Sequence, residues 1–235
     1  MVNVEKISKT YLTSRALDDI TFHAAKGQFA ALLGANGAGK TTLIRILATL
    51  TRPTSGTAKL AGLALGKQSQ RIRQQIGVMS HTPFLYGDLS AEENLRFYGR
   101  MYGPSRLNER INELLARVDL EHRRYDLVRT FSRGMQQRLS LARALLHCPR
   151  ILLLDEPFAG LDLDARTVLD ELLGAELEKG TTILLTTHDL EYALRKAERI
   201  LLLRAGKLVL NEAARDIDHS RITSMLHHSV ERPQP

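Results

Sequence analysis

A glycine-rich segment of the sequence has the spacing of a loop that wraps around phosphate groups. It reads Gly34-Ala35-Asn36-Gly37-Ala38-Gly39-Lys40-Thr41-Thr42 and fits the pattern G-x-x-x-x-G-K-[ST]. An apolar run precedes it and apolar residues at helical spacing follow it, so it should join a strand to a helix. Lys40 would reach the β- and γ-phosphates, and Thr41 would offer its hydroxyl to Mg²⁺. A glycine-rich turn that binds nothing is the alternative, but the complete pattern in this context favours a phosphate site.

Polar side chains that could act on a bound phosphate follow two further apolar runs. Residues 151–154 are followed by Asp155 and Glu156. Asp155 at the end of a strand can hold Mg²⁺, and Glu156 is placed to orient or deprotonate an attacking water. A solvated strand end is the plainer alternative. Residues 183–187 precede His188, whose imidazole could contact the γ-phosphate. A lone histidine is usually structural, so a functional role for His188 is favoured only because the other two motifs are present.

The hydrophobic pattern predicts the elements that must position these residues. Short apolar segments bounded by Gly or Pro predict strands near 2–7, 17–22, 29–33 and 57–60. Helical spacing dominates residues from about 90 to 147, which open on the capping-box pattern of Ser90 and Glu93. Beyond Pro149, apolar runs predict strands near 151–154, 181–186, 199–203 and 207–210, with helices near 164–178 and 190–197. This alternation predicts βαβ units and a parallel sheet.

The composition excludes several classes of protein. The chain has 235 residues, of which 43% are hydrophobic and 25% charged, as in ordinary globular proteins and unlike disordered ones. No apolar run approaches the roughly 18–20 residues of a membrane span, and we expect no signal peptide. The single cysteine, Cys148, excludes an internal disulfide and a multi-cysteine metal site, which suits a reducing cytoplasm. The net charge of +7 permits an anionic partner, whether nucleotide, nucleic acid or membrane surface.

The order of these motifs resembles the ATP-binding subunit of an ABC transporter over nearly the whole chain. The phosphate loop resembles that family's Walker A motif, and 151–156 resembles Walker B with its catalytic glutamate. Residues 159–162 resemble the D-loop and 187–189 the switch-histidine loop.

The resemblance implies an α/β fold with a P-loop NTPase (ABC ATPase) core, an N-terminal antiparallel β subdomain and an inserted α-helical subdomain at about 90–147. It implies a single ATP-binding domain over 1–220, followed by a short C-terminal tail over 221–235.

The resemblance also assigns roles to the site residues. ATP and Mg²⁺ would be bound, with Thr41 and Asp155 as metal ligands and with Glu156 and His188 catalytic. Tyr11 follows the first predicted strand, where the family stacks an aromatic ring on adenine; an exposed tyrosine at a strand end is the alternative.

Two motifs depart from the family's usual form. The segment 131–138 occupies the position of the signature motif, where Ser132 and Gly134 match. Without the resemblance Ser132 would be a helix N-cap; in the family this motif contacts the nucleotide of the opposite subunit. His81 replaces the usual glutamine of the Q-loop and is a tentative metal ligand. The stretch 77–95 around it resembles the heme-exporter (CcmA-type) branch involved in cytochrome c biogenesis.

We therefore expect an ATPase that powers export through a separate membrane permease, with heme as the specific candidate cargo. The alternatives are the ATP-binding subunit of a multidrug or ABC-2 type exporter, and a soluble non-transport ABC ATPase acting on nucleic acid or an assembly scaffold. The expected partners are a second copy or a paired ATP-binding subunit and an integral membrane permease, with no specific nucleic acid. The chain would lie peripherally on the cytoplasmic face of the cell membrane. Phe84, Leu85 and Tyr86 would either form part of the docking cleft or pack within their own subdomain.

Overall fold

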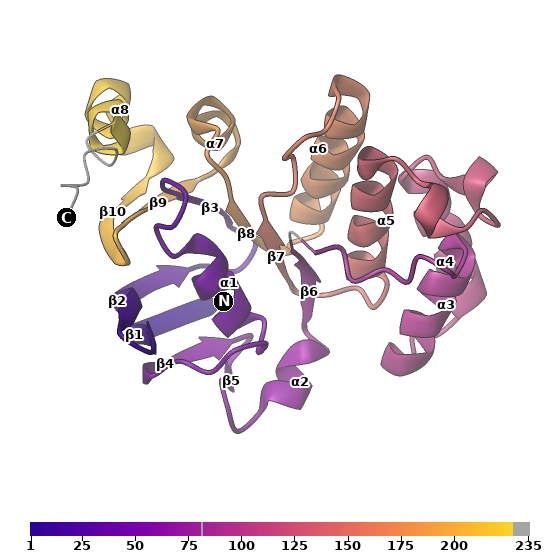
Figure 1. Ribbon diagram of the computed structural model, residues 1–235, viewed down its shortest axis with the longest axis horizontal. Coiled ribbons are helices and arrows are strands. Elements are labelled where there is room, and N and C mark those ends of the chain that lie inside the picture. Colours follow the sequence, from indigo (N-terminus) through magenta and orange to yellow (C-terminus); the bar gives the residue numbers. More distant parts are fainter. Residues whose placement is uncertain (81, 228–235) are drawn as a thin grey trace.

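The computed structural model describes residues 1–80 and 82–227, which form two β-sheets with helices packed around them (Figure 1). The strands are β1 (Val2–Tyr11), β2 (Ser14–Ala24), β3 (Phe29–Leu33), β4 (Ser55–Leu60), β5 (Leu63–Ala64), β6 (Ile76–Met79), β7 (Ile151–Asp155), β8 (Thr182–Thr186), β9 (Arg199–Arg204) and β10 (Lys207–Ala213). The α-helices are α1 (Lys40–Leu47), α2 (Ser69–Arg73), α3 (Ala91–Tyr102), α4 (Leu107–Arg117), α5 (Arg133–Leu145), α6 (Leu163–Glu178), α7 (Leu190–Lys196) and α8 (His219–His227). Turns of 3-10 helix occur at Glu121–Arg123, Val128–Thr130 and Ala214–Asp216.

The N-terminal sheet is antiparallel and runs in the order β2-β1-β4-β5. One face is apolar because side chains such as Val2, Val4 and Leu60 are buried. These side chains share a hydrophobic cluster with Leu43 and Ile46 of α1. The antiparallel β subdomain expected at the N-terminus is therefore confirmed.

The second sheet runs in the order β10-β9-β3-β8-β7-β6 and is parallel except for β10 at its edge. Every residue of β3, β7 and β8 is buried. This explains the uninterrupted apolar runs within them, since a parallel sheet is covered on both faces. The α/β fold with a parallel core, predicted from the alternating pattern, is confirmed.

The carboxyl ends of three central strands meet at one edge of this sheet. The phosphate loop leaves β3, the acid pair ends β7, and His188 follows β8. In the register, Thr186 of β8 lies beside both Leu32 of β3 and Asp155 of β7. Parallel pairing thus brings together residues that lie far apart in the sequence, at the edge where α/β proteins bind ligands.

The helical part lies on one side of the parallel sheet, where α3, α4 and α5 pack together at the right of Figure 1. The predicted capping box opens α3, because the Glu93 N–H donates to Ser90 Oγ at 3.2 Å and the Ser90 N–H donates to Glu93 Oε2 at 2.8 Å. Apolar faces of the three helices join the core cluster that includes Leu152 and Leu154 of β7. The helical part therefore shares the core of β7 and packs through α5 on β6, the strand beside the one that carries the acid pair.

The structure adds a helix near the C-terminus and short elements elsewhere. Across the boundary expected near residue 221, α8 is helical and buries Ile222, and the division into domain and tail stays a prediction. Met225 and Leu226 also pack against the core, so three apolar residues make a short helical stripe. Residues 228–235 lie outside the described residues. The short elements β5, β6 and α2 were not predicted.

Candidate nucleotide site

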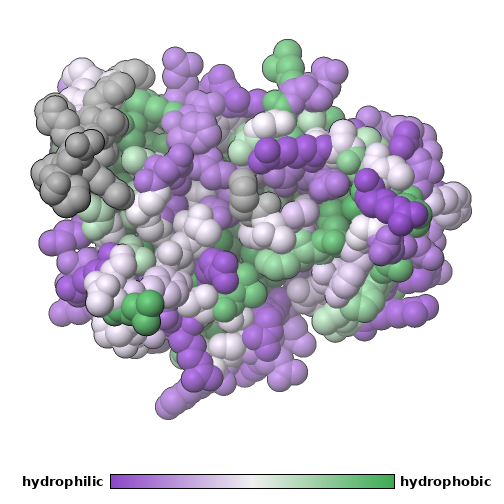
Figure 2. Space-filling view, viewed as in Figure 1, coloured by the Kyte–Doolittle hydropathy of each residue, from purple (hydrophilic) through white to green (hydrophobic). Residues whose placement is uncertain are grey.

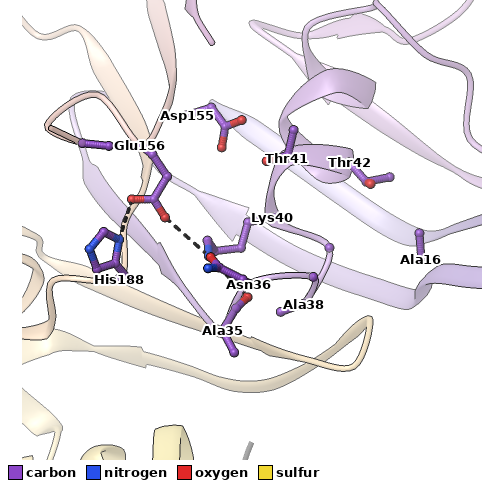
Figure 3. Close-up of a pocket in the computed structure, with 13 residues that line it drawn as sticks. Ala16, Ala35, Asn36, Ala38, Lys40, Thr41, Thr42, Asp155, Glu156 and His188 are labelled. Atoms are coloured by element: carbon purple, nitrogen blue, oxygen red, sulfur yellow. Dashed lines mark hydrogen bonds and ion pairs between the residues drawn. The ribbon is translucent and has the colours of Figure 1, made fainter. Parts of the chain in front are cut away.

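A cavity of about 690 Å³ opens at the carboxyl edge of the parallel sheet, and Figure 3 shows the side chains that line it. Its lining residues are Ala16, Ala35, Asn36, Gly37, Ala38, Gly39, Lys40, Thr41, Thr42, Asp155, Glu156, Ala159 and His188. The phosphate loop, the acid pair and the histidine that follows β8 therefore surround one space.

The phosphate loop needs glycine where it passes into α1. Gly39 has a φ of 109°, and a Cβ atom there would lie 2.6 Å from the Ala16 carbonyl oxygen. Gly39 also occupies the N-cap position of α1 without a capping side chain, and the first turn of α1 contains no acidic residue. Backbone N–H groups at the start of this helix consequently lack a side-chain acceptor, which suits an anion.

Lys40 extends into the cavity although its side chain is buried. Its Nζ donates to the Gly34 carbonyl at 2.7 Å and to the Ala35 carbonyl at 3.4 Å, and lies 3.4 Å from Glu156 Oε1. The ammonium group is therefore held at the mouth of the phosphate loop. A phosphate bound there would meet a fixed positive charge.

Asp155 provides a buried carboxylate at the end of β7. It is only 2% exposed and accepts a hydrogen bond from Thr186 Oγ1 at 2.7 Å. Within residues 1–80 and 82–227 no cation pairs with it, while the Thr41 hydroxyl lies in the same cavity. An uncompensated carboxylate beside a hydroxyl fits Mg²⁺, which takes oxygen ligands. Thr41 and Asp155 would hold the ion, which would supply positive charge against the phosphate oxygens.

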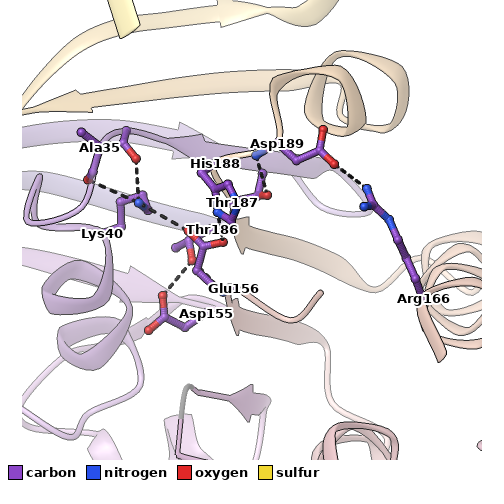
Figure 4. A network of polar contacts seen from close by, with 10 residues as sticks. Ala35, Lys40, Asp155, Glu156, Arg166, Thr186, Thr187, His188 and Asp189 are labelled. Carbon is purple, nitrogen blue, oxygen red and sulfur yellow. Dashed lines mark hydrogen bonds and ion pairs between the residues drawn. The ribbon is translucent and has the colours of Figure 1, made fainter. Parts of the chain in front are cut away.

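Glu156 sits in a constrained backbone conformation at the centre of the cluster. Its φ is 49°, and its N–H donates both to the Thr186 carbonyl, at 3.2 Å, and to Thr186 Oγ1, at 2.9 Å. This left-handed turn aims the carboxylate between Lys40 and His188, whose Nδ1 donates to Glu156 Oε2 at 3.0 Å (Figures 3 and 4). The contact holds a proton on Nδ1 and leaves the second ring nitrogen free to meet a ligand.

The chemistry that this arrangement supports is attack of water on a terminal phosphate. Glu156 is the carboxylate best placed to orient that water and accept its proton, because Asp155 is buried and hydrogen-bonded. Lys40 and His188 lie on either side of it and can stabilise negative charge on phosphate oxygens.

Comparison with known proteins places the chain in a family. The family model described as "ABC transporter" matches residues 17–159, which is more than half of the chain. The chain belongs to the ABC transporter family. The match, the complete phosphate loop and the acid pair together make it an ATPase.

Similar proteins cover most of the chain. A Nod factor export ATP-binding protein I of Cupriavidus metallidurans is 38% identical over 94% of this chain and 74% of its own length. A daunorubicin resistance ATP-binding protein, DrrA3 of Streptomyces coeruleorubidus, is 37% identical over 92% of this chain and 69% of its own.

Among solved structures, an ATP-binding subunit of an ABC transporter has a TM-score of 0.88, 31% identity, and coverage of 97% of this chain and 99% of that one. A dimeric, post-hydrolysis state of the ATP-binding cassette MJ0796 bound to ADP and Pi has a TM-score of 0.84, 28% identity, and coverage of 92% and 100%.

The residues of the signature segment lie outside the cavity of this ABC ATPase. Ser132 is the exposed N-cap of α5, and its Oγ accepts the Met135 N–H at 3.3 Å. Gly134 faces α6, since a Cβ atom there would lie 3.3 Å from the Ala165 side chain. A single chain therefore does not bring Ser132 to its own phosphate loop.

Tyr11 is a further site residue expected from the sequence. Tyr11 ends β1, is 45% exposed and has Lys9 Nζ 4.8 Å from its ring centroid. It does not line the cavity, and stacking on adenine stays a prediction. His81 lies outside the described residues.

Sequence reasoning missed several residues that shape the site. The Thr186 hydroxyl donates to the Asp155 carboxylate and accepts the Glu156 N–H. Asp189, next to His188, accepts a hydrogen bond from Arg166 of α6 (Figure 4). A hydroxyl directly after the apolar run Ile183-Leu184-Leu185 was the available signal for Thr186. Nothing in the sequence pairs Arg166 with Asp189, because that contact joins two separate helices.

Proposed function

We propose that two copies of this ABC ATPase, or one copy and a paired subunit, bind and hydrolyse ATP to drive export through a separate membrane permease. The observation that carries the proposal is the Lys40–Glu156–His188 cluster in the cavity at the phosphate loop. Glu156 would act as general base, while Lys40 and His188 would stabilise negative charge on the phosphate oxygens during hydrolysis.

A paired arrangement is supported by the position of the signature segment. Ser132 and Gly134 lie at the start of α5, outside the cavity and accessible to another chain. The similar cassette MJ0796 is described as a dimer. In a head-to-tail pair, the N-terminus of α5 would offer donors to the nucleotide held by the partner. The γ-phosphate would then be contacted by both chains, and its removal by hydrolysis would weaken the interface between them.

Attachment to a permease is supported by exposed apolar side chains on the helical part. A cavity of about 610 Å³ is lined by Leu89, Glu93, Arg96, Phe97, Arg100 and Met101. Phe97 and Met101 are exposed, and the ring of exposed Tyr86 lies 5.0 Å from that of Phe97. By contrast, Leu85 packs against the core. We propose that Tyr86 and Phe97 face the permease, which would hold the chain peripherally on the cytoplasmic side of the membrane. No helix of the described residues is long and apolar enough to cross a membrane itself.

The relatives favour a drug or natural-product exporter over a heme exporter. Their names refer to Nod factor export and daunorubicin resistance, and heme export gains no support from them. The multidrug or ABC-2 type alternative is therefore our proposal for the kind of transport. A soluble role on nucleic acid or an assembly scaffold has weaker support, because both relatives are named for export or drug resistance.

The experiment is to purify the tagged chain from its native membranes and to identify what accompanies it. A multispanning permease, together with drug sensitivity and normal cytochrome c heme staining in a deletion strain, supports the proposal. Loss of cytochrome c heme with unchanged drug sensitivity would support heme export instead.

Pairing is tested by mixing a Lys40→Ala chain with a Ser132→Ala chain. The mixed pair contains one complete site, so activity should return although each variant alone is inactive. Ser132→Asn is the matched control for the structure of α5, because asparagine keeps the N-cap of this helix while the serine hydroxyl is lost. Normal activity of Ser132→Ala alone would reject the shared site.

A further inference from the structure

The positive charge of the chain is concentrated in one segment of the sequence. Residues 20–87 contain eight Lys and Arg residues and no Asp or Glu, while the whole chain has a net charge of +7. The other residues together are therefore close to neutral. Five of the eight cations lie on or beside β4, β5 and α2 and are exposed; this basic surface consists of Arg52, Lys59, Lys67, Arg71 and Arg73.

Part of the basic surface is concave. A cavity of about 670 Å³ is lined by Thr49, Thr51, Arg52, Pro53, Gly56, Thr57, Leu65, Gly66, Lys67, Ser69 and Arg73. Its lining combines three cations with four hydroxyl groups and contains no carboxylate. Arg73 Nη1 donates to Thr49 Oγ1 at 3.2 Å, which holds the guanidinium at the cavity wall. Cations and hydroxyl donors without acidic groups suit phosphate oxygens.

The basic surface is not neutralised by the chain's own carboxylates. Among residues 1–80 and 82–227, no ion pair involves any of its five cations. The helical part differs, because Arg96 and Arg124 both pair with Glu92 there. The carboxylate of Glu5, opposite Thr57 in the sheet register, accepts a hydrogen bond from Asn3 instead. The charge is thus available to an external anion.

We infer that the basic surface binds the phosphate groups of an anionic phospholipid bilayer, an inference that rests on the proposed attachment to a membrane permease. A Lys or Arg near an anionic leaflet strengthens binding about fivefold, and the attraction extends over a Debye length of about 8 Å at physiological salt. Several unpaired cations on one surface would therefore hold and orient the ATPase beside its permease.

The local sequence and structure favour lipid over nucleic acid. Residues 30–83 contain no Phe, Tyr or Trp, so no aromatic ring from this segment could stack on bases. α2 has five residues, which is too short to fill a DNA groove as a recognition helix. Figure 2 shows hydrophilic side chains projecting along the lower edge of the molecule, where Figure 1 places β4 and α2 and the lower end of α3.

The test uses the purified full-length chain without a permease. Its sedimentation with phosphatidylcholine vesicles is compared with that of vesicles containing phosphatidylglycerol, at low and high salt. We expect binding only to the anionic vesicles and its loss at high salt. The triple variant Arg52→Gln, Lys67→Gln, Arg71→Gln should bind at least 10-fold more weakly, with unchanged ATPase activity. The matched control, Lys26→Gln, Arg150→Gln, Arg204→Gln, removes the same charge from exposed positions elsewhere and should bind as the wild type.

Other outcomes overturn the inference. Equal loss of binding in both triple variants would show that binding depends on the net charge of the chain and not on the basic surface. Tighter binding to a single-stranded RNA than to anionic vesicles would indicate a nucleic-acid partner, and competition of inorganic phosphate with vesicles at low concentration would indicate a soluble ligand. Absence of vesicle binding by a chain that hydrolyses ATP and copurifies with a permease would reject the lipid site alone. Vesicle binding without ATPase activity would instead reject the proposed function.

Discussion

Arg166 of α6 donates from Nη2 to Asp189 Oδ2 at 2.5 Å and so links α6 to the residue that follows His188 (Figure 4). The other oxygen of Asp189 accepts the Tyr192 N–H at 2.8 Å and caps α7. Burial raises the pKa of Asp189, but the hydrogen bonds from Arg166 and the Tyr192 N–H, together with the charges of Arg166 and Arg195, outweigh it, and this pKa lies below its usual value. One carboxylate therefore fixes both the start of α7 and the backbone beside His188.

Replacing Arg166 by Ala should lower kcat about fivefold with little change in KM, because His188 would lose its fixed position while the phosphate loop is unaffected. The ion pair is about a third exposed, so its loss should cost only about 0.5–1 kcal/mol of stability. Steady-state kinetics and thermal unfolding measure the two effects separately.

The Asp189→Asn variant serves as the partner of this test. Asparagine keeps the N-cap of α7 but loses the charge that attracts Arg166. If the contact positions His188, the double variant should be no slower than Arg166→Ala alone. Additive losses in kcat would argue against a shared role.

The sequence predicted the phosphate loop, the acid pair and His188 because each is a local pattern at the end of an apolar run. It did not predict the Arg166–Asp189 contact, since these residues lie 23 positions apart and meet only when α6 and α7 are placed. Non-local contacts of this kind depend on tertiary packing, which spacing along one chain does not reveal.

Replacing Thr186 by Val should remove hydrogen bonds that position both Asp155 and Glu156. Its hydroxyl donates to Asp155 and accepts the Glu156 N–H, so valine leaves the buried carboxylate without this donor. A hydrogen bond to a charged group contributes about 1.5–3 kcal/mol, and we expect a loss of stability in this range with at least 10-fold lower kcat/KM. The Mg²⁺ concentration needed for half-maximal activity should rise.

Thr186→Ser is the control, because serine keeps the hydroxyl and should retain most of the activity. A Thr186→Val enzyme with normal Mg²⁺ dependence would show that Asp155 needs no help from β8. Thr186 itself illustrates how far sequence reasoning reaches: its strand was predicted, but only the register of β7 against β8 places it beside Asp155.

Replacing Glu156 by Gln should reduce kcat at least 100-fold while leaving ATP affinity within about twofold, because an amide cannot accept the proton of water. Glu178→Gln, at an exposed position near the end of α6, is the matched control. Turnover and nucleotide affinity are measured on the same samples. Near-normal turnover by Glu156→Gln would remove Glu156 from the role of general base.

His147 gives the fold a dependence on pH that is separate from the nucleotide site. Its ring stacks on Tyr102 with centroids 3.9 Å apart, and its Nε2 lies 2.9 Å from the Ile76 carbonyl oxygen. Burial lowers the pKa of His147 to about 4; the hydrogen bond with Ile76 opposes the shift, and the charges of Arg143 and Arg110 add to it. The folded chain therefore keeps this imidazole neutral at pH values where the unfolded chain protonates it.

The consequence is a loss of stability on acidification. At pH values above about 6.5, the pKa of a histidine in the unfolded chain, His147 is neutral in both the folded and the unfolded state, and its contribution to the free energy of unfolding is complete. As the pH falls from 6.5 towards 4 only the unfolded state gains the proton, which should cost about 2 kcal/mol by pH 5. His147→Phe keeps an aromatic partner for Tyr102 but cannot titrate, so its free energy of unfolding should change less between pH 7 and pH 5. Denaturant unfolding at several pH values measures this difference, with exposed His122→Phe as the control. An unchanged pH dependence in His147→Phe would mean that other groups account for the acid sensitivity.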